Sequence, residues 1–530
     1  MMAVVLNGLK LPARPETLSL LKRAGAFFAR QNIQTYIVGG FVRDLLLKRD
    51  TADIDIALEA DALEIAPKLA IALGGKYIEL DEVNRVGRVV IASKEDPLNI
   101  VMWQLDLSTA QGGILEDLKR RDFTINAMAI GLEKIIQLKT PTDELLSNKA
   151  LLATQLTDPY NGLNDLRQGV IKSVSEKAFR ADALRLLRAV RLASELSFTI
   201  NRQTEALIRR HSHLIVGVAS ERIREELLKI LAAPETEQFL LYLDDLGLLT
   251  ALIPELALLK GTEQPRKHTW DVFNHSVKTV AAVDFVLRQG DWQYADGQIL
   301  KLIPWSVELS DYFNQKVSSG STRRLLLKLA ALLHDIAKPQ TKSIDEWGKT
   351  HFFNHPGEGA PIATRILEKL RFSSKEVKLT ADIVRYHLRP VQMSQSELPS
   401  SRAIYRYFRD TGEAAIDALF ISLADHLATR GPDLDMANWQ EHANIVAHVL
   451  SQRSEQEGVD TPSKLIDGHD LINHFNLTPG PELGKLLETV HEAQVSGEVP
   501  NKEKALSYVK DLLTLREKTT EDLPYEKKGL

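Results

Sequence analysis

The pattern of apolar and polar positions divides the chain into a strand-rich first part and a helical remainder. A helix is predicted over residues 18–30, and from about 33 to 158 short strand-like segments alternate with helical ones such as 61–73. This alternation predicts an α/β or α+β head domain. The expected strands are Tyr36–Val38, Asp53–Leu58, Arg88–Ala92, Leu98–Trp103 and Ala127–Ile130.

Beyond residue 159 strand signals almost vanish, and helical periodicity dominates over 179–231 and again towards the C-terminus. Residues 289–322 contain Gly, Ser and aromatic positions without a clear period, which indicates an insertion. The polar segment 451–463 is interpreted as a linker to a C-terminal helical piece. The predicted parts are a lead-in helix at 1–30, the head at 31–158, and helical regions at 159–265, 266–450 and 451–530.

Composition is typical of a soluble protein with several domains. The 530 residues exceed what one core organises, and 44% hydrophobic with 26% charged residues is ordinary for globular proteins. The absence of cysteine excludes disulfides and thiolate zinc sites and fits a reducing compartment. No apolar run approaches the ~20 residues of a membrane span, so we expect a cytoplasmic enzyme without a membrane partner. Because the net charge is −5, a nucleic acid would have to meet a local basic patch.

The most informative motif joins a Gly-Gly turn to an acidic strand. Side chains alternate along a strand, so Asp53 and Asp55 project to the same face with Cα atoms roughly 6.5–7 Å apart. Two carboxylates at this separation can hold Mg²⁺ against a triphosphate. Gly39 and Gly40 precede Arg43 at a predicted helix start, where backbone N–H groups attract phosphate. Each motif alone would usually be a solvated turn, but their combination predicts a metal–phosphate site.

Two later segments place charged side chains beside apolar runs. In 118–129, Arg120 or Arg121 could meet phosphate oxygens and Asp122 a ribose hydroxyl, a basic surface turn being the alternative. In 180–191, charged positions recur every three residues along an otherwise apolar helix. Such a stripe should meet anions or nucleobases, an internal ion-pair network being the alternative. The positions are Asp182, Arg185, Arg188 and, drifting around the helix, Arg191.

Together these motifs resemble class II tRNA nucleotidyltransferases, the bacterial CCA-adding and poly(A) polymerase family. The match covers roughly residues 20–260. The resemblance implies an α+β fold with an N-terminal nucleotidyltransferase head. This head would hold a small mixed sheet of five strands, followed by an all-α neck, body and HD domain.

The resemblance also implies roles for individual residues. Asp53 and Asp55 would be the catalytic Mg²⁺ ligands. The pair that selects CTP or ATP falls on Asp182 and Arg185, where Ala181 replaces the glutamate usual in the family. The other nucleotide-binding residues would be Gly39, Gly40, Arg43, Arg121, Asp122, Arg188 and Arg191.

A second metal site is suggested by the adjacent pair His334-Asp335 on an apolar helix. This pair resembles the HD phosphohydrolase pattern, in which a divalent metal is held by imidazoles and carboxylates. Mn, Ni, Fe and Zn all suit such ligands. The implied ligands are His275, His334, Asp335 and Asp425, and His355 and His387 match positions that bind a second metal in some HD families.

The implied function is Mg-dependent addition of CMP and AMP, from CTP and ATP, to the 3′ end of tRNA. Addition of CC only, of A only, or of poly(A) remains open because of Ala181. Two other classes are also open. In one, the HD domain is a metal-dependent phosphohydrolase and the head a nucleotide sensor; in the other, the chain is an RNA-binding scaffold. Residues 477–504 resemble a C-terminal helical module that contacts tRNA or forms a homodimer, simple helix packing being the alternative.

Overall fold

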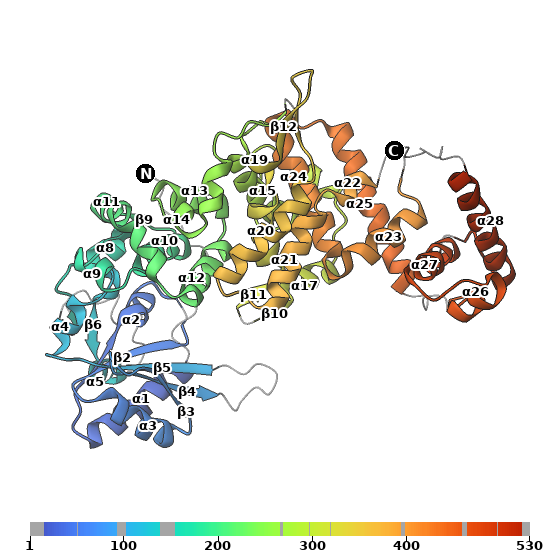
Figure 1. Cartoon of the computed structure of the whole chain (residues 1–530). Helices are drawn as coiled ribbons and strands as arrows, with labels where there is room; N and C mark the ends of the chain where they lie inside the picture. Colours follow the sequence, from blue (N-terminus) through green and yellow to red (C-terminus); the bar gives the residue numbers. More distant parts are fainter. Residues whose placement is uncertain are drawn as a thin grey trace, which may run out of the picture. The chain divides into compact units, whose positions relative to one another are not determined.

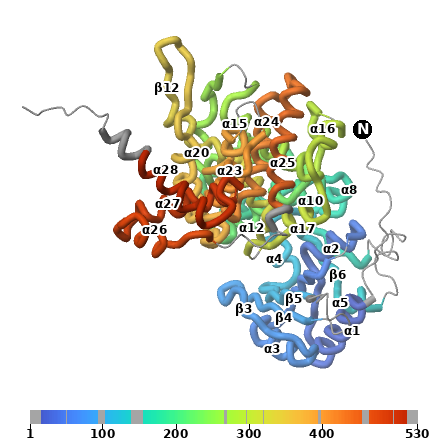
Figure 2. The backbone as a smooth tube through the Cα atoms, turned by 90° about the vertical axis from the view of Figure 1, so that its right-hand side faces the viewer, coloured from blue at the N-terminus to red at the C-terminus, as the bar shows by residue number. Residues whose placement is uncertain are grey.

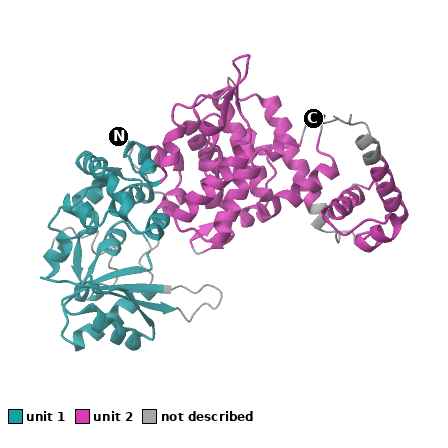
Figure 3. Ribbon diagram, in the orientation of Figure 1, with its two compact units in different colours: residues 1–226, 242–252 teal, residues 227–241, 253–530 magenta. Residues whose placement is uncertain are grey.

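The chain forms two compact units, coloured separately in Figure 3. The first contains residues 1–226 and 242–252, and the second contains 227–241 and 253–530. The computed structural model describes residues 15–49, 51–92, 102–137, 154–265, 269–295, 297–318, 320–393, 398–457, 464–495 and 497–521.

The first unit is built on a mixed sheet with the strand order β3-β4-β5-β2-β1-β6-β7. β2 and β5 are parallel and the other neighbours are antiparallel. In Figure 1, helices α1 (Pro15–Arg30) and α3 (Ala62–Leu73) lie below this sheet and α2 (Gly39–Leu46) lies above it. The strands are β1 (Thr35–Val38), β2 (Asp53–Leu58), β3 (Lys76–Asp81), β4 (Val86–Ala92), β5 (Met102–Thr109), β6 (Ala129–Gly131) and β7 (Leu156–Thr157).

Strand β2 places acidic and apolar side chains on opposite faces of the sheet. Ile54 and Ile56 are 1% and 0% exposed, and burying each contributes about 1.5–3 kcal/mol relative to exposure. Because side chains alternate along a strand, Asp53 and Asp55 must then project from the other face. The burial of the isoleucines therefore fixes which face carries the carboxylates.

The sheet has seven strands, so the expected number of five is corrected. The strand β3, which was not predicted, lies at the edge of the sheet. Its Ile78 and Leu80 are 46% and 45% exposed, so its apolar side chains do not mark a buried face. β7 is only two residues long. The predicted strand 98–103 falls mostly outside the described residues, and the observed β5 runs on to Thr109.

In the helical part of the first unit, the prediction that 180–191 form one helix with a single charged stripe is wrong. Asp182 does not belong to the same helix as Arg185, because α9 (Lys177–Ala181) ends before it and α10 (Arg185–Leu196) begins after it. The Asp182 backbone is extended (φ −149°), and its carboxylate accepts a hydrogen bond from the Leu184 backbone N–H at 3.1 Å. Short polar side chains compete with helix formation by such local bonds. The unit also contains α8 (Gly162–Gln168), α11 (Arg202–His211) and α14 (Leu249–Leu252).

The second unit is a helical assembly around one largely buried helix, α18 (Arg323–Leu333). Nearly all its side chains are buried, which is typical of a helix surrounded by others. It contacts α15, α21 and α24. Two short hairpins interrupt the helical pattern: β10–β11 (Lys316–Ser318 and Ser321–Thr322) and β12–β13 (Lys342–Ile344 and Thr350–Phe352). The other long helices are α15 (Val272–Val286), α20 (His355–Lys369), α21 (Ser374–Tyr386), α24 (Ala415–Arg430) and α25 (Met436–Glu457).

The segment 289–322, predicted as an irregular insertion, is instead largely structured. It contains α16 (Gly297–Lys301) and α17 (Val307–Asn314). Phe313 at the end of α17 is fully buried and packs edge-on against Phe420 of α24. Trp305 stacks on Phe313 at a centroid distance of 6.3 Å. These aromatic residues anchor the segment although its sequence lacks a helical period.

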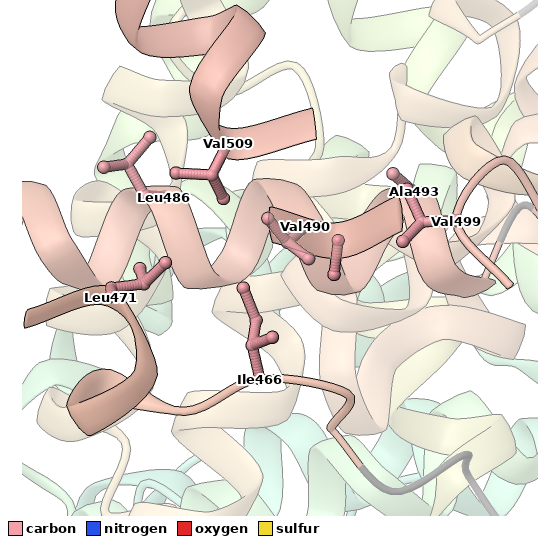
Figure 4. Close-up of a cluster of buried hydrophobic side chains, with 8 residues drawn as sticks. Ile466, Leu471, Leu486, Val490, Ala493, Val499 and Val509 are labelled. Atoms are coloured by element: carbon pink, nitrogen blue, oxygen red, sulfur yellow. The ribbon is translucent and has the colours of Figure 1, made fainter. Parts of the chain in front are cut away.

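The C-terminal helices have a hydrophobic core of their own, shown in Figure 4. They are α26 (Gly468–Phe475), α27 (Pro481–Val495) and α28 (Lys502–Glu521). Figure 2 shows α27 beside α23 (Ser401–Thr411), in agreement with their contacts. The predicted linker 451–463 is helical as far as Glu457, where α25 ends. Among the described residues, no helix is both long and apolar enough to cross a membrane.

Candidate functional site

Asp55 stands at the centre of the acidic face of the sheet. Its Cα is paired with Val38 of β1 on one side and with Asp106 of β5 on the other. Its Oδ2 accepts a hydrogen bond from the Gly40 backbone N–H at 3.3 Å. Burial, together with the negative charge of Asp106, raises the pKa of Asp55. A cation bound here would relieve the repulsion between these carboxylates, and the exposed Asp53 two residues earlier could share it.

Asp106 is a site residue that the sequence reasoning missed. It lines the same cavity as Asp55. Arg88 of β4 holds it in a bidentate ion pair, with Nε–Oδ1 and Nη2–Oδ2 distances of 2.7 and 2.8 Å. The sequence feature that could have identified Asp106 is its single charge between two leucines, Leu105 and Leu107, which are both buried on one face of the strand.

The Gly-Gly turn approaches the acidic face so closely that no side chain fits at Gly39. Its φ is +69°, and a Cβ there would lie 2.6 Å from Asp55 Oδ2 and 2.7 Å from Arg121 Nη1. Arg43 lies below the turn, 8% exposed, where Nη1 donates to Asn126 Oδ1 and Nη2 to Asp44 Oδ2, both at 2.9 Å. The structure therefore does not place Arg43 among the residues that line the cavity.

A cavity of about 440 Å³ opens between the acidic face and the helical part of the first unit. Acidic side chains line one part of it and arginines another. Asp53, Arg43 and Arg191 are not among the lining residues. The predicted residues that the structure brings together here are Gly39, Gly40, Asp55, Arg121, Asp122, Asp182, Arg185 and Arg188.

The arginines of the cavity are held in place by carboxylates. Arg121 donates from Nε and Nη2 to Asp117 Oδ2 of α4 (Ile114–Lys119) at 3.0 and 2.9 Å. Arg188 Nε lies 3.0 Å from Asp122 Oδ2. Burial opposes ionisation of Asp122, but Arg188 and the Asn126 amide together lower its pKa. Asp122 is therefore a fixed negative charge that orients Arg188 towards the cavity.

The two residues predicted to select the base face the cavity from either side of the break before α10. Asp182 is held by Arg222 of α12 (Ser220–Ala232), with Nη2–Oδ2 at 2.8 Å, a partner that the sequence reasoning missed. Arg185 Nη1 donates to the Ala178 backbone carbonyl at 3.3 Å. Arg191, by contrast, points away into an ion-pair network with Glu195 and Glu226 at 2.8 and 2.7 Å. The alternative of internal ion pairs thus applies to Arg191.

In the second unit, all six residues of the predicted HD site come together from α15, α20, α24 and the turns that directly follow α18 and α21. The pair His334-Asp335 thus lies in the turn after α18 and not, as was predicted, on the helix itself. His275 Nε2 lies 3.0 Å from Asp425 Oδ1 and 3.2 Å from His334 Nε2. His334 Nε2 lies 3.1 Å from Asp335 Oδ2. We call this set the histidine–aspartate cluster; it comprises His275, His334, Asp335, His355, His387 and Asp425.

Three imidazoles of the histidine–aspartate cluster are oriented for metal binding. The Nδ1 atoms of His334, His355 and His387 each lie 2.8 Å from a backbone carbonyl three residues earlier. A proton fixed on Nδ1 leaves the Nε2 of His355 and of His387 with a free lone pair, the usual arrangement of a histidine ligand. Burial opposes protonation of His334, but Asp335 and Asp425 raise its pKa to about 10, so a metal ion would replace the Nε2 proton of this imidazole. Burial lowers the pKa of His387 to about 3, which keeps this imidazole neutral. The donor set therefore fits a divalent transition metal.

Lys338 is a further member of this region that the sequence reasoning missed. Its Nζ lies 2.6 Å from Asp335 Oδ2 and donates to Gln264 Oε1 at 2.6 Å. Lys338 is 6% exposed, so its charge compensates part of the buried negative charge of the cluster. Its position three residues after Asp335 was the available signal.

Paired carboxylates beside an arginine-lined cavity suit an enzyme that handles a nucleoside triphosphate with a divalent metal. Comparison with protein families agrees with this class. A model described as the poly(A) polymerase head domain matches residues 35–172. A probable RNA- and SrmB-binding site of polymerase A matches 197–259, and a putative tRNA nucleotidyltransferase domain 2 matches 362–509.

Curated relatives and solved structures extend the likeness to nearly the whole chain. An A-adding tRNA nucleotidyltransferase of Deinococcus radiodurans is 31% identical over 479 residues, covering 89% of this chain and 94% of the relative. A CC-adding tRNA nucleotidyltransferase of Thermus thermophilus is 30% identical, covering 89% and 92%. A CCA-adding enzyme of Lactobacillus gasseri is 33% identical, also covering 89% and 92%. The chain therefore belongs to the tRNA nucleotidyltransferase family.

The fold agrees with that assignment. The Thermotoga maritima CCA-adding enzyme complexed with tRNA has a TM-score of 0.57 at 23% identity, with 95% of this chain and 97% of that chain covered. The Bacillus stearothermophilus CCA-adding enzyme in complex with CTP has a TM-score of 0.58 at 22% identity, with 96% and 100% covered. Enzymes of this class use a divalent metal ion.

Proposed function

We propose that this chain adds CMP and AMP, from CTP and ATP, to the 3′ end of tRNA without a nucleic-acid template and with Mg²⁺ as the metal. The observation that carries the proposal is the position of Asp55, which faces a cavity lined by arginines and by the Gly39–Gly40 turn. Carboxylates, oriented cations and the backbone N–H groups of a glycine turn are the kinds of group that bind a nucleoside triphosphate and its metal ion.

The residues divide the work as follows. Asp53 and Asp55 would hold the Mg²⁺, which polarises a phosphoryl oxygen and makes a hydroxyl more acidic when it is bound. The N–H groups of the Gly-Gly turn and the guanidinium of Arg121 would bind the phosphates. These contacts align the α-phosphate for attack by the tRNA 3′-hydroxyl and stabilise the charge that develops as pyrophosphate leaves.

Base selection would rest on Asp182 and Arg185. A carboxylate accepts and a guanidinium donates hydrogen bonds, so together they can read the edge of a cytosine or an adenine. Asp182 is held by Arg222 and Arg185 by a backbone carbonyl, so both side chains are already oriented before a base arrives.

A second candidate is partial addition, of A only or of CC only. Ala181 lines the cavity at the position where the family usually has a glutamate, and a methyl group cannot accept a hydrogen bond from a base. A-adding and CC-adding enzymes are also among the relatives. Poly(A) addition uses the same chemistry and is the third product to be tested.

One assay separates these candidates. The purified protein is incubated with tRNAs that end at the discriminator base, at C, or at CC, and with CTP, ATP or both. CCA addition predicts that all three ends grow to CCA and stop. Growth of only the CC end shows A addition, growth that stops at CC shows CC addition, and a long adenine tail shows poly(A) synthesis. If no end grows, the proposal is wrong.

We also propose that residues 266–450 form an HD domain whose histidine–aspartate cluster binds a divalent metal such as Mn²⁺ or Ni²⁺ and hydrolyses phosphate esters. The support is the convergence of three oriented imidazoles and two carboxylates in one buried place. Calorimetric titration of the metal-free protein with Mn²⁺ tests binding, with His334→Ala as the variant expected to lose it. Unchanged binding by this variant would refute the assignment.

A further inference from the structure

A second cavity, of about 530 Å³, opens beside the histidine–aspartate cluster. It lies where the start of α20 meets the end of α21 and the short helix α22 (Arg389–Gln392). One lining residue, Pro356, directly follows His355 in the chain, and two others, Tyr386 and Leu388, flank His387. Chain neighbours of His355 and His387 therefore form part of the cavity wall, although neither histidine lines it, and the rings of these two histidines are themselves neighbours, with centroids 5.4 Å apart.

The polar lining of this cavity is mainly cationic. Arg385 is exposed and has no carboxylate within ion-pair distance among the described residues. Arg389 Nη2 lies 3.2 Å from Asp410 Oδ2. Asp410 also accepts a bond from Arg409 Nε at 2.9 Å, so its negative charge is shared between two arginines. Two guanidinium groups and one shared carboxylate leave the cavity with an excess of positive charge.

Arg389 also carries an unsatisfied donor. Its Nε is buried and has no hydrogen-bond partner among the described residues. Leaving a buried donor unpaired is unfavourable, and such groups in native structures need an explanation. An anion in the cavity would satisfy this donor once the Arg389 side chain turns its Nε outwards, because a guanidinium can donate from Nε and a terminal nitrogen to two oxygens of one phosphate.

The cluster itself is almost sealed from solvent. His275, His334 and His387 have fully buried side chains, and Asp335 is 1% exposed. The other two members are His355, with a 9% exposed side chain, and Asp425, with 18%. A ligand of the cluster must therefore approach at its edge, and His355 stands next to the cavity wall at Pro356.

We propose that this cavity is a phosphate-binding subsite in which Arg385 and Arg389 hold the terminal phosphate of a nucleotide-sized phosphomonoester next to His355 and His387. The inference rests on the proposed metal function of the histidine–aspartate cluster and names its substrate class. The volume lies within the roughly 300–1,000 Å³ usual for small-molecule sites. Gln392 and Tyr386 supply polar and aromatic surface for the remainder of the ligand.

Inorganic phosphate binding to the full-length protein is the primary test, measured by equilibrium dialysis on metal-free and on Mn²⁺-loaded samples. Arg385→Gln and Arg389→Gln should each weaken phosphate binding at least tenfold in both samples. Arg365→Gln is the matched control, because Arg365 lines a different cavity, next to Phe353 and Glu358. This control should bind phosphate like the unaltered protein, and thermal unfolding should show that all three variants are folded.

The outcomes separate this inference from the proposed metal function. If Mn²⁺ binds but phosphate does not, or if Arg385→Gln and Arg389→Gln bind phosphate normally, the subsite is refuted and the metal site stands. If phosphate binding depends on both arginines but Mn²⁺ does not bind, the subsite stands and the metal function fails. Competition identifies the ligand source: displacement of phosphate by AMP indicates a free nucleotide, and displacement only by a 3′-phosphorylated RNA indicates an RNA end. Displacement by neither contradicts the proposal.

Discussion

Substitution of Gly39 by alanine is expected to damage the nucleotide site by displacing two charged groups at once. The added Cβ would lie 2.6 Å from Asp55 Oδ2 and 2.7 Å from Arg121 Nη1, distances that real Cβ atoms essentially never show. Neither partner can yield freely. The Asp55 carboxylate accepts a bond from Gly40 N–H, and Arg121 is held by Asp117. A displacement approaching 1 Å can cost about 100-fold in rate, and we expect a loss of that order in CMP and AMP incorporation.

The backbone strain of this substitution must be separated from the clash. Gly39 has a φ of +69°, and an alanine in the left-handed region costs roughly 1–2 kcal/mol. Gly74, at the end of α3, has a φ of +74°, but a Cβ there would have nothing within 4 Å. Gly74→Ala should therefore lower the free energy of unfolding by a similar 1–2 kcal/mol and leave incorporation unchanged.

The assay is steady-state incorporation of labelled CMP and AMP into tRNA, with denaturant unfolding measured in parallel. The comparison of the two alanine variants isolates the effect of the clash at the site. If Gly39→Ala incorporates nucleotides as fast as Gly74→Ala, the close packing of the turn against Asp55 and Arg121 has no part in catalysis.

Three further results are expected. Asp55→Asn should reduce incorporation at least 100-fold at any Mg²⁺ concentration, and activity restored by high Mg²⁺ would contradict the assignment. His334→Ala should abolish Mn²⁺ binding in calorimetry and leave CMP incorporation intact; loss of both would count against two separate metal sites. Burial opposes ionisation of Glu492, but three arginines of α23 lower its pKa to about 2. The ion pairs that join α27 to α23 should therefore keep their full stabilising effect above pH 4.5, the usual pKa of a glutamate, and lose it as the pH falls towards 2. Proteolysis between the two helices as a function of pH measures this, and release already at pH 5 would refute it.

The parts of the site that the sequence predicted are those in which periodicity and chemistry agree. Ile54 and Ile56 had to be buried, so Asp53 and Asp55 were assigned to the opposite face before their surroundings were known. The histidine–aspartate cluster is implied by the resemblance of His334-Asp335 and its partners to the HD pattern, although these residues are spread over some 150 positions, from His275 to Asp425.

The errors arise where tertiary or local interactions override a simple period. Asp182 has helical spacing to Arg185, but its own bond to Leu184 N–H ends the helical pattern before it. Asp106 and Arg222 became site residues only through pairing across the fold, with Asp55 in the sheet register and with Asp182 from a later helix. Arg191 carries the charge that a nucleotide contact needs, but its guanidinium forms ion pairs with Glu195 and Glu226. No single-residue property distinguishes these cases.

The central claim is that Asp53 and Asp55 share one metal ion beside a triphosphate bound at the Gly39–Gly40 turn. Crystals grown with CTP and Mn²⁺, with diffraction recorded at the manganese absorption edge, test it directly. The account predicts an anomalous peak between the two carboxylates, with the polyphosphate next to the turn and to Arg121. A polyphosphate bound elsewhere, or a peak far from both aspartates, would contradict it.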